Sequence, residues 1–456
     1  MTEFLGTSTP ATLHRRAVLK MMGLGGALLA GAPILAACTP GGGGEPTPTT
    51  GGGDPNATLS LHHDAALGPA FQPYVNDFNK RYTPLRLKTA YVTSDYAGTT
   101  NTQLAGGSVD YDVLFTDAGY AQSWFDNGWI QKLDGFDGAA DLSASWRPGV
   151  KEENQAADGS LVTLPYYRRI EVFVYNADHL QRIGAEPPAT WDEFLSQCRE
   201  LKAKKVAATP YSPFWTADFS MFWVEFVTEC FSSGSGPLFG DKFEPVFADD
   251  PVVAATLERW KTMLSEGLVP KDVFTTAYGD VGNIYAGGKS SFTIRYGPDV
   301  KGWRDPKKSR VAAVSRNGMI PGTTRETLSG GAQWCMTAAS KNKPQAWTLL
   351  KYLSAKDKDG AYYTPLHLIA LDLGLVTPYD EVNEDPQVQK AWSSWADTKA
   401  LAEQQRKSRV LGKVVNQPWY GQFQTAATAA LQDVVRGKKS VREGLNAAAD
   451  FVKGKL

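Results

Sequence analysis

Strand-like and helix-like segments alternate between residues 58 and 115, and this alternation restricts the fold more than any other feature of the sequence. The periodicity of apolar residues predicts strands at 58–62, 85–92 and 112–115 and a helix at 69–82. Strands that are separated by helices pair in parallel, and the helices cover the sheet. We therefore expect an α/β fold, with a second α/β unit that begins at 172–175.

The sequence also indicates where some helices begin and which helix faces pack into the core. Thr190 to Glu193 and Ser440 to Glu443 are capping boxes, in which a hydroxyl and a carboxylate satisfy free backbone amides. Four tryptophans occur on helix faces or caps and are assigned to the core: Trp124, Trp191, Trp260 and Trp347.

The N-terminus has the pattern of an export signal. The twin arginine Arg15-Arg16 precedes a short apolar run, which ends in Leu-Ala-Ala-Cys at Cys38. This ending resembles the bacterial lipobox, which implies a signal at residues 1–37 and a lipid on Cys38. An uncleaved signal anchor is the alternative, although the run is shorter and richer in glycine than a membrane-spanning helix of about 20 residues requires.

The segment that follows Cys38 consists almost entirely of Gly, Pro and Thr. It lacks apolar side chains that could offset the entropy of ordering. We interpret residues 38–56 as a flexible tether that holds a folded body outside the cytoplasmic membrane.

Composition excludes several classes of function. The charge of the whole chain is −1, which argues against a nucleic-acid partner because such a partner requires a basic face. The sequence has no His-Glu-x-x-His motif and no zinc-binding spacing of Cys and His, so no metal, cofactor or catalytic residue is predicted. Three cysteines beyond Cys38 have apolar neighbours and are expected to be buried: Cys198, Cys230 and Cys335.

Several segments in order resemble extracellular solute-binding proteins of family 1, the type of the maltose-binding protein. The most specific is Gly-Ala-Glu-Pro-Pro-Ala-Thr-Trp-Asp-Glu at 184–193. Gly-Trp-Ile-Gln-Lys-Leu-Asp at 128–134 and Val-Tyr-Asn-Ala-Asp at 174–178 also match. The resemblance implies a two-lobed periplasmic-binding-protein type II fold, a sugar bound between the lobes, and ABC-transporter permease subunits as partners of a monomeric protein.

The resemblance also implies three crossings between the lobes, near 165–169, 329–334 and 373–378. Lobe one is then 57–167 plus 333–374, and lobe two is 168–332 plus 375–456.

A sugar site needs aromatic rings together with directional polar groups. In open α/β sheets such groups lie beyond the carboxyl ends of the strands. Three criteria are used: position on the predicted strands and crossings, the aromatic-rich loop 211–223 for Trp215, and the resemblance for the last two residues. They select fourteen residues: His63, Asp64, Asp95, Tyr96, Asp117, Tyr167, Arg168, Trp215, Arg295, Tyr296, Gly331, Trp334, Trp419 and Tyr420.

Three questions stay open at this level. Strand alternation allows only one of His62 and His63, and one of Arg168 and Arg169, to face the cleft. An anionic sugar is an option if both Arg168 and Arg295 face it. A glycoside hydrolase, or a binding protein for a polyamine, peptide or metal chelate, is the alternative function.

Overall fold

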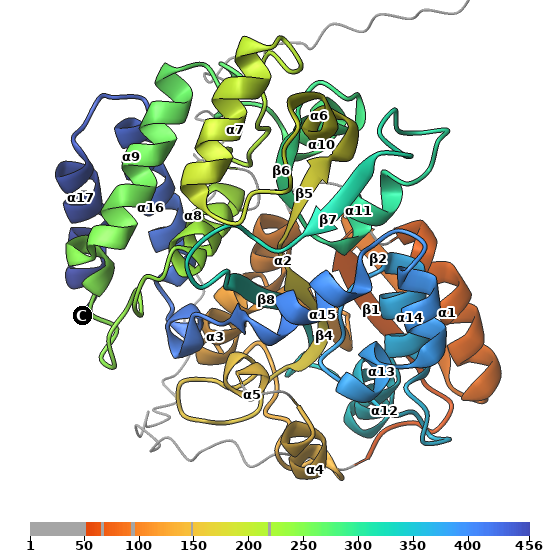
Figure 1. The fold of residues 1–456 in the computed structure, drawn as a ribbon. Helices are drawn as coiled ribbons and strands as arrows, with labels where there is room; N and C mark the ends of the chain where they lie inside the picture. The colour runs from red at the N-terminus through yellow and green to blue at the C-terminus, as the bar shows by residue number, and fades with distance from the viewer. Residues whose placement is uncertain (1–51, 65–67, 93–95, 147–148, 218–219) are drawn as a thin grey trace, which may run out of the picture. The chain divides into compact units, whose positions relative to one another are not determined.

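A computed structural model describes residues 52–64, 68–92, 96–146, 149–217 and 220–456 (Figure 1). The predicted signal, Cys38 and the tether as far as residue 51 lie outside the described residues. Asp54 accepts a hydrogen bond from the amide of Ala57, and its own amide lies 3.3 Å from Asn342 Oδ1. The described chain is therefore in contact with the folded body from Asp54 onward.

The first sheet has the order β2-β1-β3-β8-β4, and β9 pairs with β8. Strand β1 is parallel to β2 and to β3, as the alternation predicts, whereas β8 is antiparallel to β3 and β4. The strands of this sheet are β1 (Thr58–Asp64), β2 (Arg86–Val92), β3 (Val113–Asp117), β4 (Leu164–Ile170), β8 (Thr327–Met336) and β9 (Ser408–Arg409). Its helices in the first third of the chain are α1 (Gly68–Arg81), α2 (Tyr96–Ala105), α3 (Ala118–Asp126), α4 (Ala139–Ala144) and α5 (Val150–Glu153).

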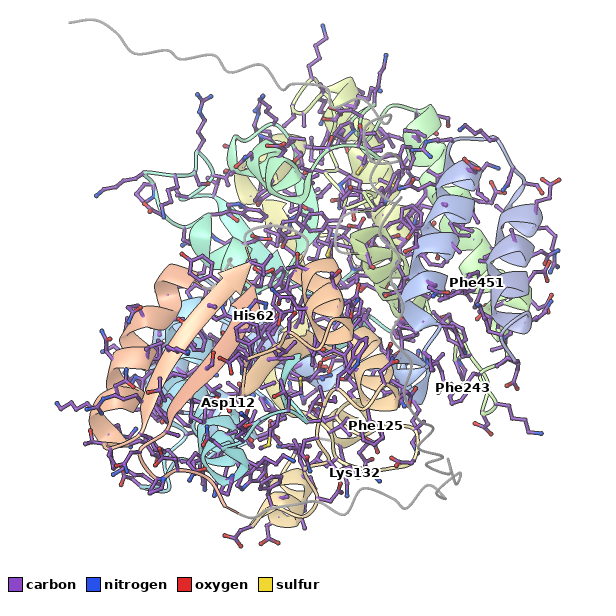
Figure 2. All side chains as sticks on the ribbon, turned by 180° about the vertical axis from the view of Figure 1, so that it is seen from behind. His62, Asp112, Phe125, Lys132, Phe243 and Phe451 are labelled. Carbon is purple, nitrogen blue, oxygen red and sulfur yellow. The ribbon has the colours of Figure 1, made fainter. Side chains whose placement is uncertain are left out.

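A buried carboxylate connects the first sheet to the segment that follows β8. Asp112 accepts hydrogen bonds from the Ser60 amide at 2.9 Å and from Ser340 Oγ at 2.6 Å. Figure 2 labels Asp112 and His62 in this part of the sheet. These bonds help to set the relative positions of β1 and the end of β8.

The second sheet has the order β6-β5-β7, and both pairings are antiparallel. Its strands are β5 (Val172–Asn176), β6 (Phe292–Arg295) and β7 (Ser315–Gly318). The helices between these strands are α6 (Ala177–Ile183), α7 (Trp191–Ala203), α8 (Met221–Ser232), η3 (Val246–Asp249), α9 (Pro251–Ser265), α10 (Tyr278–Ala286) and α11 (Gly297–Gly302). The remaining helices are α12 (Lys343–Ser354), η4 (Pro365–Leu373), α13 (Asp380–Asn383), α14 (Pro386–Trp392), α15 (Thr398–Arg406), η5 (Gly412–Asn416), α16 (Tyr420–Val435) and α17 (Val441–Lys453).

Both predicted capping boxes are confirmed. The hydroxyls of Thr190 and Ser440 accept from the amides of Glu193 and Glu443, and each glutamate carboxylate accepts from the amide of its capping residue. Asp250 caps α9 through the amide of Val252. Each of these three helices therefore begins where its sequence supplies a partner for free amides.

Burial confirms the predicted core residues. The four tryptophans assigned to the core are at most 5% exposed, and the three cysteines are buried free thiols. One core cluster surrounds the second sheet and α16, and another joins the first sheet to Trp347, Tyr379 and Trp392. Tyr379 and Trp392 belong to the core cluster of the first sheet, although they follow Gly374, the predicted last residue of lobe one. The division into lobes at the predicted residues stays a prediction.

Candidate functional site

Three chain segments meet at the junction of the two sheets, and their pairing decides which side chains face which way. Arg168 lies opposite Gly331, and Arg169 lies opposite Gly330, in the β4–β8 pair. The amide of Arg168 also donates to the carbonyl of Val376, at 2.7 Å, in the third segment. Because neighbouring residues of a strand face opposite sides, Arg168 and Arg169 lie on opposite faces of the crossing strands.

A group of charged and aromatic side chains gathers on the Arg169 face, and we call it the crossing cluster. Arg169 lies near the end of β4, Glu171 joins β4 to β5, Tyr278 begins α10, Tyr296 caps α11 and Asp299 lies in the first turn of α11. Its members are Arg169, Glu171, Tyr278, Tyr296 and Asp299.

Short contacts hold the crossing cluster together. Arg169 Nε lies 2.8 Å from Glu171 Oε1, and its guanidinium carbon lies 5.6 Å from the centroid of the Tyr296 ring. Tyr278 donates to Asp299 Oδ2 at 3.0 Å. The side chains of Arg169 and Asp299 are 24% and 27% exposed, so water reaches a donor and an acceptor in the same group.

A glycine brings α11 close to the third crossing segment. A Cβ atom at Gly297 would collide with the carbonyl oxygen of Gly374. Pro298 follows at the start of the helix, where a missing amide donor costs little. Local sequence thus places Tyr296 and Asp299 beside the crossing.

A buried cation, Arg295, packs against the crossing cluster. Arg295 is fully buried, and its guanidinium carbon lies 3.3 Å from the centroid of the Phe214 ring. Its Nε lies 3.7 Å from Asp299 Oδ2, and Phe214 stacks on Tyr278 at 4.4 Å. Arg295 therefore has a supporting position, with no exposed surface for a ligand.

The charges in this region compensate one another. Burial raises the pKa of Glu171 and of Asp299, and the neighbouring arginines oppose this shift. Burial lowers the pKa of Arg295. Burial also acts to lower the pKa of Arg169, but the Glu171 carboxylate and nearby tyrosines raise it above its usual value. Two guanidinium groups and two carboxyl groups thus leave the site close to neutral.

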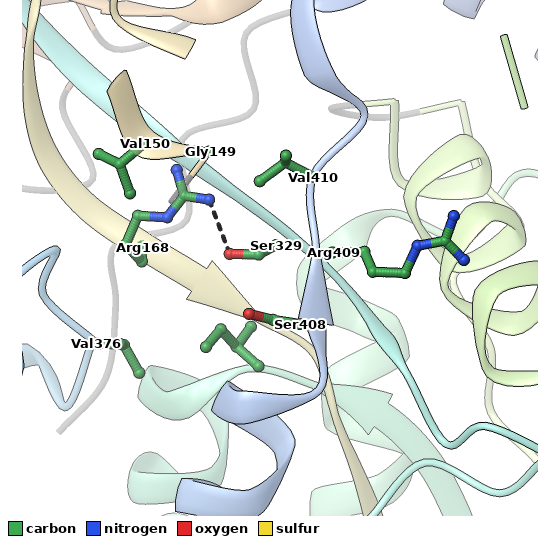
Figure 3. Close-up of a pocket in the computed structure, with 9 residues that line it drawn as sticks. Gly149, Val150, Arg168, Ser329, Val376, Ser408, Arg409 and Val410 are labelled. Atoms are coloured by element: carbon green, nitrogen blue, oxygen red, sulfur yellow. Dashed lines mark hydrogen bonds between the residues drawn. The ribbon is translucent and has the colours of Figure 1, made fainter. Parts of the chain in front are cut away.

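Arg168 lines a cavity on the opposite face of the crossing strands (Figure 3). It forms a buried ion pair with Glu153 and donates to Ser329 Oγ at 2.9 Å. The cavity has a volume of about 340 Å³, and the side chain of Arg409 points away from it. None of the described lining residues is aromatic: Gly149, Val150, Arg168, Ile170, Ser329, Val376, Ser408, Arg409 and Val410.

The predicted residues of the first sheet lie at the carboxyl ends of its strands. His63 is fully buried with Nδ1 2.7 Å from the carbonyl of Asp64, whose side chain is half-buried. Tyr96 donates to the carbonyl of Phe115 at 2.7 Å. Asp95 and the side chain of Asp117 lie outside the described part of the chain.

Several other predicted residues are not brought to the crossing cluster. Trp215 is fully buried, and its ring stacks on Trp260 with 4.5 Å between centroids. Trp334 is fully buried, and its ring centroid lies 4.6 Å from that of Tyr166. Trp419 and Tyr420 are less than a tenth exposed, and Tyr420 accepts from Trp223 Nε1 at 3.1 Å.

Of the fourteen predicted residues, Tyr296 belongs to the crossing cluster, and Tyr167 and Arg295 adjoin it. Gly331 pairs with Arg168 on the other face. The prediction missed Glu171, Tyr278 and Asp299, and it selected Arg168 in place of Arg169. The sequence offers one usable signal, the Gly-Pro pair that starts a helix before Asp299. A role for any of these residues in binding a ligand stays a prediction.

The described residues contain neither a cluster of metal ligands nor a membrane-spanning helix. No group of three His, Cys, Asp or Glu residues in the described ranges could hold a metal ion. None of the helices in the same ranges combines the length and the apolar character needed to cross a membrane.

The sequence of the chain is similar to those of known proteins. A family model described as bacterial extracellular solute-binding protein matches residues 73–396. An erythritol/L-threitol-binding protein of Mycolicibacterium smegmatis is 24% identical over 410 residues, which is 79% of this chain and 82% of the relative.

Solved structures show the same fold. A maltose-bound MalE3 of T. maritima gives a TM-score of 0.75 at 16% identity and covers 88% of this chain and 100% of its own. A solute-binding protein of Agrobacterium radiobacter in complex with ribitol gives a TM-score of 0.71 at 18% identity and covers 88% of this chain and 98% of its own. The predicted two-lobed α/β fold is confirmed.

Proposed function

Because the chain belongs to the family of bacterial extracellular solute-binding proteins, we propose that it captures a sugar or polyol between its lobes and delivers it to an ABC importer. The family and the relatives compared are binding proteins, so the prediction of a protein without catalytic activity is confirmed at the level of the family. The family match likewise supports a location outside the cytoplasm.

The crossing cluster is the observation that carries the proposal. It offers a guanidinium donor, a carboxylate acceptor and two tyrosine rings within one partly exposed group. A sugar or polyol presents hydroxyls to such donors and acceptors and C–H faces to rings. One relative is named as an erythritol/L-threitol-binding protein, and two structures of the same fold were solved with ribitol and with maltose bound, which are ligands of this chemical kind.

The charge balance favours a neutral ligand. An anionic sugar would require free cations, but Arg168 is paired with Glu153 on the other face and Arg295 is fully buried beside Asp299. Arg169 is paired with Glu171. Each of these three arginines thus has a carboxylate partner within the protein, and adding an anion beside them would cost desolvation without a matching gain.

The proposed lobes are 57–167 plus 333–374 and 168–332 plus 375–456. Ligand contacts from both lobes would favour the closed arrangement in proportion to the difference in affinity between the closed and open states. The permease would then meet a closed, loaded monomer.

We also propose that Cys38 carries a lipid and that residues 38–56 tether the body to the outer face of the cytoplasmic membrane. Leu35 to Cys38 supports this assignment, as does the Gly, Pro and Thr composition that follows. A tether raises the concentration of the carrier near its permease.

A ligand panel tests the proposal. The purified chain is mixed with erythritol, mannitol, maltose, lactose, galacturonate and spermidine, and thermal unfolding, calorimetry and analysis of the recovered ligand are compared. A neutral sugar or polyol at about 100 times its Kd should stabilise the protein by about 2.7 kcal/mol and be recovered unchanged. Stabilisation by spermidine alone, or cleavage of a disaccharide, would contradict the proposal.

A further inference from the structure

Six basic side chains crowd one part of the surface, and we call them the basic patch. Lys289 follows α10, Arg316 lies in β7, and the other four lie in the connection between α11 and β7, which Figure 1 draws as a long loop. Residues 303–316 contain one acidic side chain, Asp305. The members of the basic patch are Lys289, Arg304, Lys307, Lys308, Arg310 and Arg316.

Hydrogen bonds hold these cations close to one another. Nη1 of Arg304 and Nη1 of Arg316 donate to the same carbonyl, that of Ser315, at 2.9 Å and 2.8 Å. The amide of Arg310 donates to the carbonyl of Ala286 at 2.8 Å, and this bond places the loop beside the end of α10 and Lys289. The basic patch is therefore a cluster in space as well as in sequence.

The cations have little compensation within the protein. Lys308 lies 4.0 Å from Asp305, and in the described ranges none of the other five has a carboxylate within ion-pair distance. Burial lowers the pKa of Arg304, and the positive charge of Arg316 lowers it further. Like charges at this spacing destabilise the folded state, and an external polyanion would relieve that repulsion.

The surroundings indicate what kind of polyanion fits. A protein partner needs an apolar anchor at the centre of its interface. Among the described residues, the large hydrophobic side chains with high exposure are Tyr91, Val246 and Leu456, and none belongs to the basic patch. Lysines and arginines at the surface without an apolar anchor are suited to a diffuse anionic surface.

We propose that the basic patch binds the anionic headgroups of a phospholipid membrane. Each Lys or Arg near such a surface strengthens binding roughly fivefold at low ionic strength. The interaction is independent of the ligand site, and a lipid on Cys38 would raise its occupancy by keeping the body near the bilayer. The membrane-facing side of the second lobe would then be the one that carries α11 and β7.

Vesicle co-sedimentation tests this proposal. The full chain with Cys38→Ser, which removes the lipid site, is mixed with vesicles of phosphatidylglycerol and phosphatidylcholine in equal parts or of phosphatidylcholine alone. Binding is expected to the anionic vesicles only. Raising the salt from about 0.01 M to about 1 M should abolish it, because the screening length falls from roughly 30 Å to roughly 3 Å.

A matched pair of triple variants locates the site. The first reverses Lys307, Lys308 and Arg310 to Glu; the second reverses Lys204, Lys271 and Lys438, which are exposed elsewhere, and changes the net charge equally. The first should lose binding on the order of a hundredfold or more, and the second much less. Thermal unfolding verifies that both variants are folded.

Three outcomes would overturn the proposal: no binding to anionic vesicles at low salt, equal losses in both triple variants, or binding to soluble polyglutamate but not to vesicles. The last result would identify an acidic protein surface as the partner instead.

Discussion

The guanidinium of Arg169 lies 5.6 Å from the centre of the Tyr296 ring, although the two residues are 127 positions apart and belong to different segments, β4 and the cap of α11. Arg259, on α9, repeats this arrangement outside the crossing cluster. It lies 4.6 Å from the Trp191 ring and forms an ion pair with the buried Glu229, as Arg169 does with Glu171. The two arginines therefore form a matched pair for separating binding from stability.

Arg169→Ala is expected to weaken ligand affinity by about 10- to 100-fold, because a hydrogen bond to a charged group contributes about 1.5–3 kcal/mol. Arg259→Ala should lower the melting temperature comparably and leave affinity unchanged. Calorimetry with the best ligand of the panel, together with thermal unfolding, measures both. Equal affinity losses would exclude a ligand contact at Arg169.

Gly330 and Gly331 are neighbours with opposite expected responses to alanine. A Cβ at Gly330 meets no atom within 4 Å, whereas a Cβ at Gly331 would collide with the carbonyl oxygen of Tyr167. Gly331→Ala should therefore destabilise the fold by at least about 1–3 kcal/mol, and Gly330→Ala should leave stability nearly unchanged while altering affinity on the Arg169 face. Urea unfolding and calorimetry measure the two effects, and equal stability losses would contradict the assigned faces.

Glu225 makes the stability of the folded protein fall as pH rises. It is buried, accepts from Tyr211 at 2.7 Å, and burial together with the charge of Glu229 raises its pKa from 4.5 to about 8. Between these values the folded state keeps a proton that the unfolded state releases, so its contribution to stability falls as pH rises through this window, by up to about 1.4 kcal/mol per pH unit.

Glu225→Gln keeps an uncharged acceptor in this position and should be more stable than the wild type at pH 8, with little difference at pH 4.5. Melting temperatures across this range provide the measurement. Parallel profiles for the two proteins would show that Glu225 does not titrate in this window.

His62 has the opposite effect, because it makes the stability of the folded protein fall as pH falls. Its ring stacks between Tyr96 and Tyr111 at 5.2 Å and 4.3 Å, and burial, with the charge of His63, lowers its pKa from 6.5 to about 4. The unfolded state therefore binds more protons between pH 4 and 6.5, and stability is lost as pH falls through this window.

His62→Phe keeps a stacking ring and removes the titration, so its stability should fall less than that of the wild type between pH 6.5 and 4. His179→Phe is the comparison at a histidine whose pKa is also lowered by burial but which bonds to Ser291. An acid response in His62→Phe as steep as in the wild type would contradict the assignment.

The proposed lipid anchor has a direct test. Cys38→Ser should move the protein from the membrane fraction to the soluble extracytoplasmic fraction and remove incorporation of labelled palmitate. Cys230→Ser, at a buried free thiol, serves as the control and should leave both unchanged. Retention of Cys38→Ser in the membrane after a high-salt wash would favour an uncleaved signal anchor.

The sequence by itself determined the features that depend on neighbours along the chain. The parallel pairing of β1 with β2 and β3, both capping boxes and the buried tryptophan faces follow from periodicity and from local hydrogen bonding. The sequence signals that predict these features span only a few residues each, so one sequence is sufficient to identify them.

Only the tertiary structure decided which polar and aromatic residues form the candidate site. The faces of Arg168 and Arg169 depend on a register with β8, more than 150 residues away, and a shift of one residue exchanges them. Trp215 became a core residue because the Trp260 ring covers it, and Asp299 joined Arg169 because α11 approaches Gly374. Side-chain exposure is a property of the packed chain, and no local pattern encodes it.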